Sequence, residues 1–280
     1  MWAHMNGFKE QCLQLRKAGH TLTEIAAITG RSKSSIYFHI NQIPLSDEKI
    51  KSISLAAGVR ARAIATLRKG VSERDFKKFN KWTKNTVLAV AHLTFDGTIS
   101  RTSCVYNNRE KVLIDAVEQG MKEIYDYEPK RYLNTLTGVS RIGYFNVTLS
   151  SYIMKKSKEL LSEVENLPKE LKKVFIRAFF DDEGCMDFRP KKNRRQIRGY
   201  QKDVSILFLI QKLLLDFGID SKIVKPNEVV ISSKENLIKY QKEIGFSAGI
   251  RRNENRSNSI WKKPLEKNEL LALAINSFKS

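Results

Sequence analysis

Cysteine is scarce in this chain, and its three copies, Cys12, Cys104 and Cys185, lie far apart with no CxxC spacing. Such a set favours neither a disulfide framework nor a zinc site. The four histidines are scattered too and show no metal-ligand spacing. We also find no long apolar run and no signal-peptide pattern. These absences predict a reduced, intracellular protein, cytoplasmic or nucleoid-associated, with no membrane partner.

Acidic residues are too few to balance the basic ones. The 280 residues include 50 Lys+Arg against 30 Asp+Glu, a formal charge of +20, and the excess is spread along the whole chain. A folded protein with this charge repels itself, so a polyanionic partner is expected. Nucleic acid is the first candidate, and a solvated basic surface with no partner is the alternative.

Residues 1–45 have the pattern of three short helices. Apolar residues at helical spacing mark the first, over 8–17, and Gly19 ends it. A capping box of Thr21 and Glu24 is expected to start the second. After a turn at Gly30, Ser32 is expected to cap a third helix that runs to about residue 41. The last two helices form a helix-turn-helix pattern.

In a helix-turn-helix unit, the second helix of the pair enters the major groove with its N-terminal residues near base edges. Ile36 and Ile40, four positions apart, are expected to face the core. An ordinary helical cap without DNA contacts is the alternative. The residues expected to face DNA are Lys33, Ser34, Ser35 and Tyr37, with Arg31 able to reach a phosphate.

Residues 46–82 are expected to form a basic linker. Arginine and lysine surround alanine-rich stretches there, which favours a basic helix. Such a helix could lie on the phosphate backbone or be a solvated connector, and the sequence does not separate these two interpretations.

An internal repeat organises the rest of the chain. Residues 87–97 and 174–184 match at a constant offset of 87 positions, with a valine at each start and an acid followed by glycine at each end. A repeat of only two copies indicates a pseudo-symmetric pair. We predict an α+β fold of two αββαββα repeats, residues 83–166 and 167–280, with the boundary at Pro168 and a small all-α helix-turn-helix domain in front.

The elements expected after each motif follow one order. In the first repeat a hairpin over 98–106 precedes a helix over 109–125. Two strands, near 131–135 and 144–149, and a helix over 150–164 follow them. In the second repeat we expect strands near 186–189 and 194–200, a helix over 204–217, strands near 222–225 and 229–232, and a helix over 234–244.

The acid at the end of each repeated helix points to metal chemistry. Asp96 and Glu183 would lie at carbonyl ends of helices, where partial negative charge disfavours an acid. Two such acids close together repel unless a cation lies between them. Mg²⁺, or Mn²⁺ in its place, suits carboxylate and phosphate oxygens. Gly97 and Gly184 are expected to end the helices in left-handed conformation. The small residues Ala91 and Ala178 would let the two helices approach closely.

The two segments 89–97 and 176–184 resemble the paired motifs of LAGLIDADG homing endonucleases, and the resemblance covers roughly residues 83–280. It implies that Asp96 and Glu183 bind the catalytic metal, with Gly97 and Gly184 beside them. It also implies two sheets that form a saddle in the major groove of double-stranded DNA and cut both strands across the minor groove. Two unlike repeats in one chain predict a monomer and a long, asymmetric site.

Some positions depart from the motif or extend it. His92 replaces an aliphatic residue, and its apolar neighbours favour a place in the helix interface rather than a ligand role. Asp181 and Asp182 add acids beside Glu183. We expect them to cap the helix end or to be solvated, with a supporting role at the metal as the alternative. The resemblance further implies a lysine before the last helix that tunes the nucleophilic water, and Lys262 and Lys263 are the candidates, with phosphate contact as their alternative role.

A strand over 194–200 carries the strongest base-reading pattern. Alternate positions of a strand share one face, and arginine can recognise guanine while glutamine recognises adenine. A basic hairpin without sequence preference is the alternative. The predicted base-reading residues are Arg194, Gln196, Arg198 and Tyr200, the predicted phosphate contacts are Lys191, Lys192 and Arg195, and weaker candidates in the first repeat are Asn107, Arg131 and Arg141.

Two other functions stay open beside the endonuclease. A regulator that binds DNA without cutting could use the same scaffold, although it has no need for two mutually repelling acids. An RNA-splicing cofactor could use the same basic surface, but the sequence has no aromatic stacking platform of the kind that single-stranded RNA recognition uses. RNA is therefore the less favoured partner.

Overall fold

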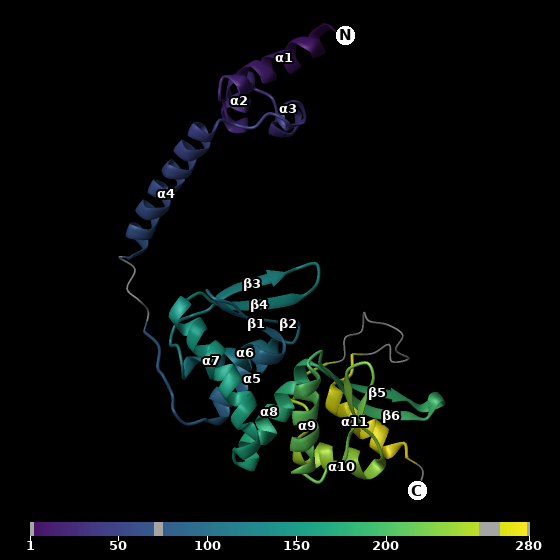
Figure 1. The fold of residues 1–280 in the computed structure, drawn as a ribbon. Helices are drawn as coiled ribbons and strands as arrows, with labels where there is room; N and C mark the ends of the chain where they lie inside the picture. Colours follow the sequence, from purple (N-terminus) through teal and green to yellow (C-terminus); the bar gives the residue numbers. More distant parts are fainter. Residues whose placement is uncertain (1–2, 70–74, 252–263, 279–280) are drawn as a thin grey trace. The chain divides into compact units, whose positions relative to one another are not determined.

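The computed structural model of the chain describes residues 3–69, 75–251 and 264–278. The chain divides into two compact units, Met1–Glu73 and Arg74–Ser280 (Figure 1). We describe each unit by itself. Among the described helices, none has the length and apolar character needed to cross a membrane.

The first unit begins with three helices, α1 (Ala3–Lys17), α2 (Leu22–Thr29) and α3 (Lys33–Ile40). They enclose a small core of Cys12, Ile25, Ile36 and Ile40, all buried. The local signals act as the sequence predicts. Thr21 and Glu24 form a capping box, Gly30 has a left-handed φ of 68°, and the Ser32 side chain caps α3.

A longer helix, α4 (Asp47–Lys69), completes the first unit. Its described side chains are almost all exposed, including apolar ones such as Leu55 and Val59. An ion pair between Lys49 and Glu24 of α2, 3.2 Å long, joins the start of α4 to the three helices.

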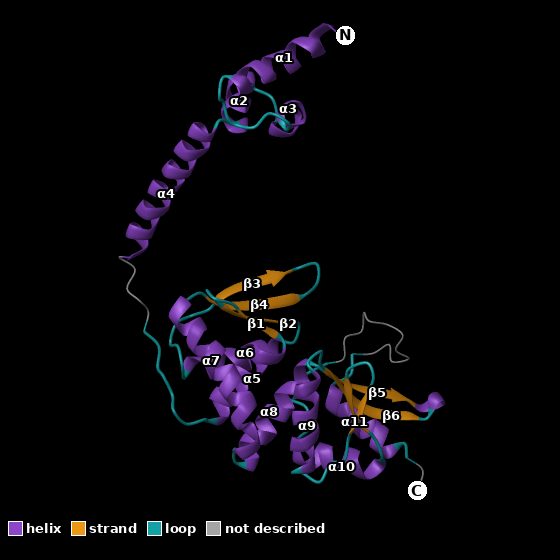
Figure 2. Ribbon diagram, in the orientation of Figure 1, coloured by secondary structure: helices purple, strands orange, loops and turns teal. Residues whose placement is uncertain are grey.

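The second unit contains two αββαββα repeats, so the predicted α+β class is confirmed (Figure 2). An additional helix, α11 (Lys267–Asn276), follows the second repeat. The first repeat comprises α5 (Lys84–Phe95), β1 (Gly97–Ile99), β2 (Cys104–Asn108), α6 (Lys111–Lys122), β3 (Lys130–Asn134), β4 (Val139–Tyr144) and α7 (Val147–Glu163). The second comprises α8 (Lys169–Asp182), β5 (Gly184–Arg189), β6 (Arg194–Tyr200), α9 (Val204–Leu215), β7 (Lys222–Val224), β8 (Glu228–Ile231) and α10 (Lys234–Glu243).

Each repeat forms one antiparallel four-stranded sheet, with strand orders β1-β2-β4-β3 and β5-β6-β8-β7. Because paired residues of antiparallel strands share a face, the register assigns each side chain to a face. The helix-covered face carries buried residues such as Tyr106 and Ile142 in the first sheet and Ile197 and Ile231 in the second. The other face of each sheet is open.

Helices α5 and α8 pack directly against each other at the centre of the second unit (Figure 1). Ala91 and Ala178 are both buried there, as the sequence predicts for a close helix pair. Phe95 of α5 adds edge-to-face ring contacts with Phe175 and Phe179 of α8, at centroid distances of 5.2 and 5.3 Å. Small and aromatic residues together therefore join the two repeats into one core.

One expectation for the first repeat is wrong. The strand expected over 144–149 ends at Tyr144, because the Asn146 side chain accepts a hydrogen bond from the Leu149 N–H and caps α7. The last residues of the expected linker, from 75 on, belong to the second unit and contact α7. Tyr152 Oη donates to the Phe79 carbonyl at 3.0 Å and accepts from the Phe79 N–H at 2.8 Å.

Candidate metal centre and nucleic-acid interface

Asp96 and Glu183 occupy equivalent positions in the two repeats, each as the C-terminal cap of a central helix. The glycine that follows each acid starts a strand and does not have the left-handed conformation expected from the sequence. It is required for a different reason. A Cβ on Gly97 would lie 2.5 Å from the Leu93 carbonyl oxygen, and Gly184 stands in the same relation to Phe180. Any larger residue would push the strand, and the acid, away from the helix.

The surroundings of both acids disfavour their charge. Burial and the nearby charge of Asp182 raise the pKa of Asp96 to about 6. Burial and the charges of Asp96 and Asp182 raise the pKa of Glu183 to about 7. Lys267 acts in the opposite direction on both. Two carboxylates with raised pKa values and few partners have the electrostatics of a site that a cation would relieve.

The donor set suits a magnesium-type ion. Mg²⁺ is commonly held by one or two carboxylates and takes its other ligands from water and substrate phosphates. Asp96 and Glu183 supply the carboxylates. The described residues contain no group of three His, Cys, Asp or Glu side chains arranged to hold a metal by themselves. A site formed here would therefore depend on water and a phosphate oxygen for its remaining ligands.

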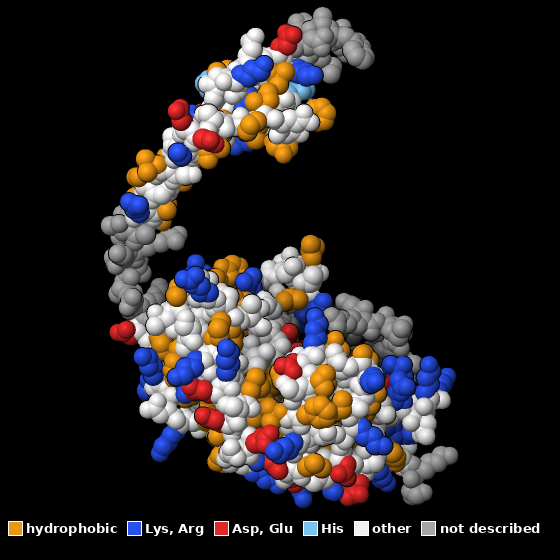
Figure 3. Space-filling model, viewed as in Figure 1, with side chains coloured by type: hydrophobic (Ala, Val, Ile, Leu, Met, Phe, Trp, Pro, Cys, Tyr) orange, Lys and Arg blue, Asp and Glu red, His pale blue; other side chains and the backbone are white. Residues whose placement is uncertain are grey.

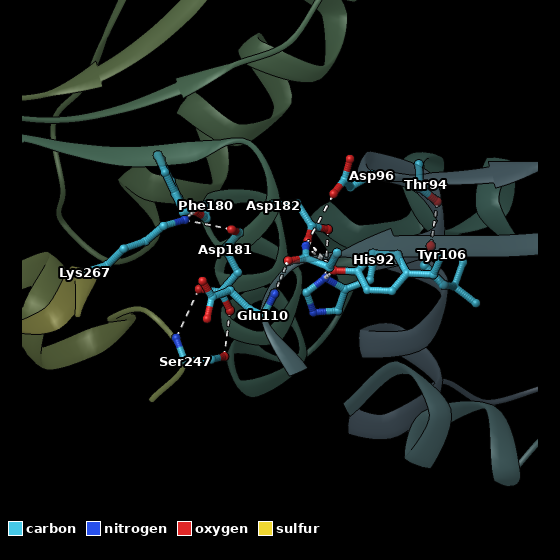
Figure 4. A network of polar contacts seen from close by, with 12 residues as sticks. His92, Thr94, Asp96, Tyr106, Glu110, Phe180, Asp181, Asp182, Ser247 and Lys267 are labelled. Atoms are coloured by element: carbon cyan, nitrogen blue, oxygen red, sulfur yellow. Dashed lines mark hydrogen bonds and ion pairs between the residues drawn. The ribbon is translucent and has the colours of Figure 1, made fainter. Parts of the chain in front are cut away.

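A buried polar network crosses the α5–α8 interface beside the acids (Figure 4). Asp182 Oδ2 lies 2.8 Å from His92 Nδ1, and Asp182 Oδ1 accepts a hydrogen bond from Tyr106 Oη at 2.6 Å. Asn108 Nδ2 donates to Tyr106 Oη at 3.1 Å and to Asp96 at 3.4 Å. Burial is the largest single influence and lowers the pKa of His92, but the carboxylates of Asp182, Asp181 and Asp96 together raise it above its ordinary value.

His92 is thus buried in the helix interface, as the sequence analysis expects, whereas the expectation for Asp182 is wrong. Its carboxylate is fully buried and links the two repeats instead of facing solvent. Asp181 is also buried. It accepts hydrogen bonds from the backbone N–H of Ser247 at 3.1 Å and from its hydroxyl at 2.6 Å.

Lys267, in the first turn of α11, lies against the end of α8 (Figure 4). Its Nζ donates to the backbone carbonyls of Phe180 at 3.1 Å and Asp181 at 2.7 Å. A cation at the carbonyl end of a helix is favourable. Burial lowers the pKa of Lys267. Lys262 and Lys263, the lysines predicted from sequence, lie outside the described residues.

Sequence reasoning missed Lys267 although a signal was present. Lys267, Leu270, Leu271 and Ala274 share one side of α11 at helical spacing, and all four are buried. A lysine in phase with an apolar stripe indicates a buried cation. The roles of Asp182 and Tyr106 had no such signal, because their contacts join distant segments of the chain.

The open face of the second sheet carries the predicted base-reading residues. Arg194, Gln196, Arg198 and Tyr200 alternate on it, while Ile197 and Gly199 face the core. Lys191 and Lys192 are exposed at the hairpin turn between β5 and β6. Figure 3 shows Lys and Arg side chains gathered at the outer end of this hairpin.

Arg195 differs from its predicted placement. It pairs with Phe188 across the hairpin and lies on the helix-covered face. Its Nε donates to Ser277 Oγ at 2.7 Å, its Nη2 donates to the Ser277 carbonyl at 3.0 Å, and its guanidinium lies over the Phe278 ring. These contacts give Arg195 a packing role in place of the expected phosphate contact.

The first sheet has fewer charges on its open face. Arg141 and Asn107 face each other across β2 and β4, and the Arg141 guanidinium lies over the ring of Tyr132. Arg131 lies in the same row as Ile142 on the other face and forms an ion pair with the buried Glu118 of α6. Arg131, a weaker predicted DNA contact, therefore lies on the helix-covered side of the sheet, although half of its side chain is exposed.

In the first unit, the predicted DNA-facing residues Lys33, Ser34, Ser35 and Tyr37 are all exposed on α3, and so is Arg31 in front of it. Ile36 and Ile40 are buried on the opposite side of the helix. A DNA-binding role for α2 and α3 stays a prediction.

Comparison with known proteins finds similarity within the second repeat. A family model described as a LAGLIDADG-like domain matches residues 170–245. A solved structure of I-DmoI in complex with DNA and Mn has 14% identity and a TM-score of 0.43, over 58% of this chain and 98% of that chain. The N-terminal LAGLIDADG domain of DUF199/WhiA has 16% identity and a TM-score of 0.44, over 61% and 88% of the two chains. No curated protein sequence matches the chain.

Proposed function

We propose that this protein is a site-specific, divalent-metal-dependent DNA endonuclease of the LAGLIDADG homing type. One observation carries the proposal. Two carboxylates, Asp96 and Glu183, end the paired central helices of the two repeats, and each has a raised pKa with the other repeat's acids among the causes. A fold gains nothing in stability from such an arrangement, so binding of a cation is its best explanation.

In this proposal Asp96 and Glu183 hold Mg²⁺ or Mn²⁺ next to the scissile phosphates. When bound, such an ion supplies an activated water and stabilises the leaving oxygen. Asn108 orients Asp96 through its hydrogen bond, while Lys267 holds the end of α8 and therefore the backbone that carries Glu183. The buried Lys267 also adds positive charge near the place where negative charge develops during cleavage.

DNA recognition is assigned to the open faces of the two sheets. The second sheet supplies Arg194, Gln196 and Tyr200, and the first supplies Arg141 and Asn107. The exposed side of α3 would add a further contact through the helix-turn-helix arrangement. Because the open faces differ in sequence, we propose that a monomer recognises an asymmetric site on double-stranded DNA.

The test is cleavage of a plasmid library with random and genomic inserts, with Mg²⁺ or with EDTA. We expect linear products whose formation requires both the metal and the two acids, so Asp96→Asn and Glu183→Gln should be inactive. Glu235→Gln, which removes an exposed charge paired with Lys239 on α10, is the matched control.

Tight, salt-sensitive DNA binding without cutting under any divalent metal would reject the endonuclease and favour the regulator. Preferential binding of structured RNA over duplex DNA would favour the splicing cofactor. Sequencing the ends of linear products would identify the target site directly.

A further inference from the structure

A carboxylate lies in the middle of the arginines on the open face of the second sheet. Asp187 on β5 is buried, although it lies on the open face of the sheet, and three arginines surround it. Arg189 Nε is 2.7 Å from its Oδ1, while Nη1 of Arg198 and Nη1 of Arg194 are 3.2 and 3.4 Å from its Oδ2.

These three arginines are not equally available to DNA. Arg198 directs Nε and Nη2 to Glu228 on β8, at 3.0 Å for Nε, and Nη1 to Asp187. The fork that would bind guanine is therefore engaged within the sheet, and the contacts with both carboxylates raise the pKa of Arg198. Arg198 connects the neighbouring strands β5, β6 and β8 and is poorly placed to recognise a base.

Arg189 and Arg194 are held differently. Each meets Asp187 through one nitrogen, and both keep a substantial part of the side chain exposed, 37% and 43%. The remaining guanidinium nitrogens have no other ion pair among the described residues. An arginine that is held at one nitrogen and free at the others has lost conformational freedom before binding, so binding costs it less entropy.

The acid also reduces attraction to DNA of any sequence. With Asp187 and Glu228 among three arginines, the cluster has a net charge of +1, and without Asp187 it would be +2. Contacts with phosphates give affinity without sequence preference, and each neutralised charge removes part of it. Base contacts by oriented arginines do carry sequence preference. Asp187 orients two arginines and reduces the net charge, and both effects favour binding of a specific sequence over binding of DNA in general.

We infer that Asp187 determines specificity: it orients Arg189 and Arg194 toward guanine edges in the major groove and suppresses binding to other sequences. This inference rests on the proposed DNA-binding function and assigns Arg189, which sequence analysis did not single out, as a base-reading residue. It reassigns Arg198 from base recognition to support of the sheet.

The experiment is selection of the full-length protein on a pool of random duplex DNA without divalent metal, followed by sequencing, with affinity for one random 30-base-pair duplex measured over a series of salt concentrations. We expect Asp187→Asn to bind the random duplex several-fold more tightly, with a salt slope steeper by about one. Its preference for guanine at one or two positions should fall about tenfold.

Two arginine variants separate orientation from charge. Arg189→Lys keeps the charge and loses the fork, so it should retain the affinity for the random duplex and lose preference at one position. Arg198→Lys should keep the preference at every position. Glu235→Gln removes one acidic charge outside the sheet and controls for net charge. Thermal unfolding of every variant checks the fold.

Unchanged selection by Asp187→Asn and Arg189→Lys would overturn the inference, and so would loss of preference in Arg198→Lys alone. If Glu235→Gln gained as much affinity for the random duplex as Asp187→Asn, net charge alone would explain the gain, and the inference would also be overturned. If the unaltered protein selects no sequence at all, the proposed function fails together with the inference. If it selects a site that Asp187→Asn retains, only the inference fails.

Discussion

The two repeats share a backbone plan but distribute their charges differently. In the first, α5 ends in a single acid that receives a hydrogen bond from Asn108, and the open face of its sheet carries scattered residues such as Arg141. In the second, α8 ends in three consecutive acids, and its sheet holds a compact cluster of arginines and acids. The shared backbone plan positions the two carboxylates, whereas the different side chains on the two sheets could contact different parts of a DNA site.

The interface between the repeats shows the same asymmetry. Position 92 is histidine in α5, and the equivalent residue of α8 is Phe179, while Asp182 of α8 corresponds to Phe95. The buried His92–Asp182 pair therefore occurs once and in one direction. A buried ionic pair adds little net stability, so we interpret it as a contact that favours one pairing of the two unlike halves.

The largest expected effect concerns the feature that both repeats share. Asp96→Asn and Glu183→Gln should each lower the cleavage rate by about a thousandfold, or about 4 kcal/mol of transition-state stabilisation, because each would remove one charged ligand of the proposed metal. Single-turnover cleavage of the identified site measures this. If one variant keeps near-normal activity, the two acids are not equivalent and the shared role is wrong.

The interface pair gives the next effect. Asp182→Ala should destabilise the protein by about 3–5 kcal/mol, because it leaves the buried His92 without the carboxylate that its Nδ1 contacts and removes the acceptor for Tyr106. Adding His92→Leu should recover part of this loss. Chemical denaturation of the two single variants and the double variant measures the coupling, and strictly additive losses would contradict a direct interaction.

The raised pKa of Glu183 should make the free energy of unfolding decrease as pH rises. The pKa of Glu183 is about 7 in the folded protein and 4.5 ordinarily. The folded state therefore keeps its proton to higher pH, so its stability falls as pH increases from 4.5 to 7 and stays low above that.

Glu183→Gln lacks this penalty. Without metal, it should melt a few degrees above the unaltered protein at pH 8 and at the same temperature below pH 4.5, as measured by scanning calorimetry. A difference that is independent of pH would mean that the charge of Glu183 is not its cause.

The smallest effect distinguishes the two faces of the β5–β6 hairpin. Lys191→Ala with Lys192→Ala should reduce the salt slope of DNA binding by about two, since both are exposed at the turn. Arg195→Gln should leave the slope unchanged, because its guanidinium is held by Ser277 on the helix-covered face. A reduced slope in Arg195→Gln would place this arginine on DNA after all.

Local and repeated features could be read from the sequence. The capping box at Thr21, the order of elements in both repeats, the pairing of Ala91 with Ala178 and the alternation of residues 194–200 depend on near neighbours or on a fixed period. The equivalence of Asp96 and Glu183 could also be read from the sequence, because the two segments that contain them match at a constant offset of 87 residues.

Only the tertiary structure determined which side chains meet across the chain. It brought Lys267 to the end of α8, placed Asp182 between His92 and Tyr106, turned Arg131 and Arg195 to the helix-covered faces and surrounded Asp187 with arginines. Each of these contacts depends on the register of strands or the packing of helices. Sequence spacing fixes which face of an element a residue occupies, whereas the partner on that face is decided by packing.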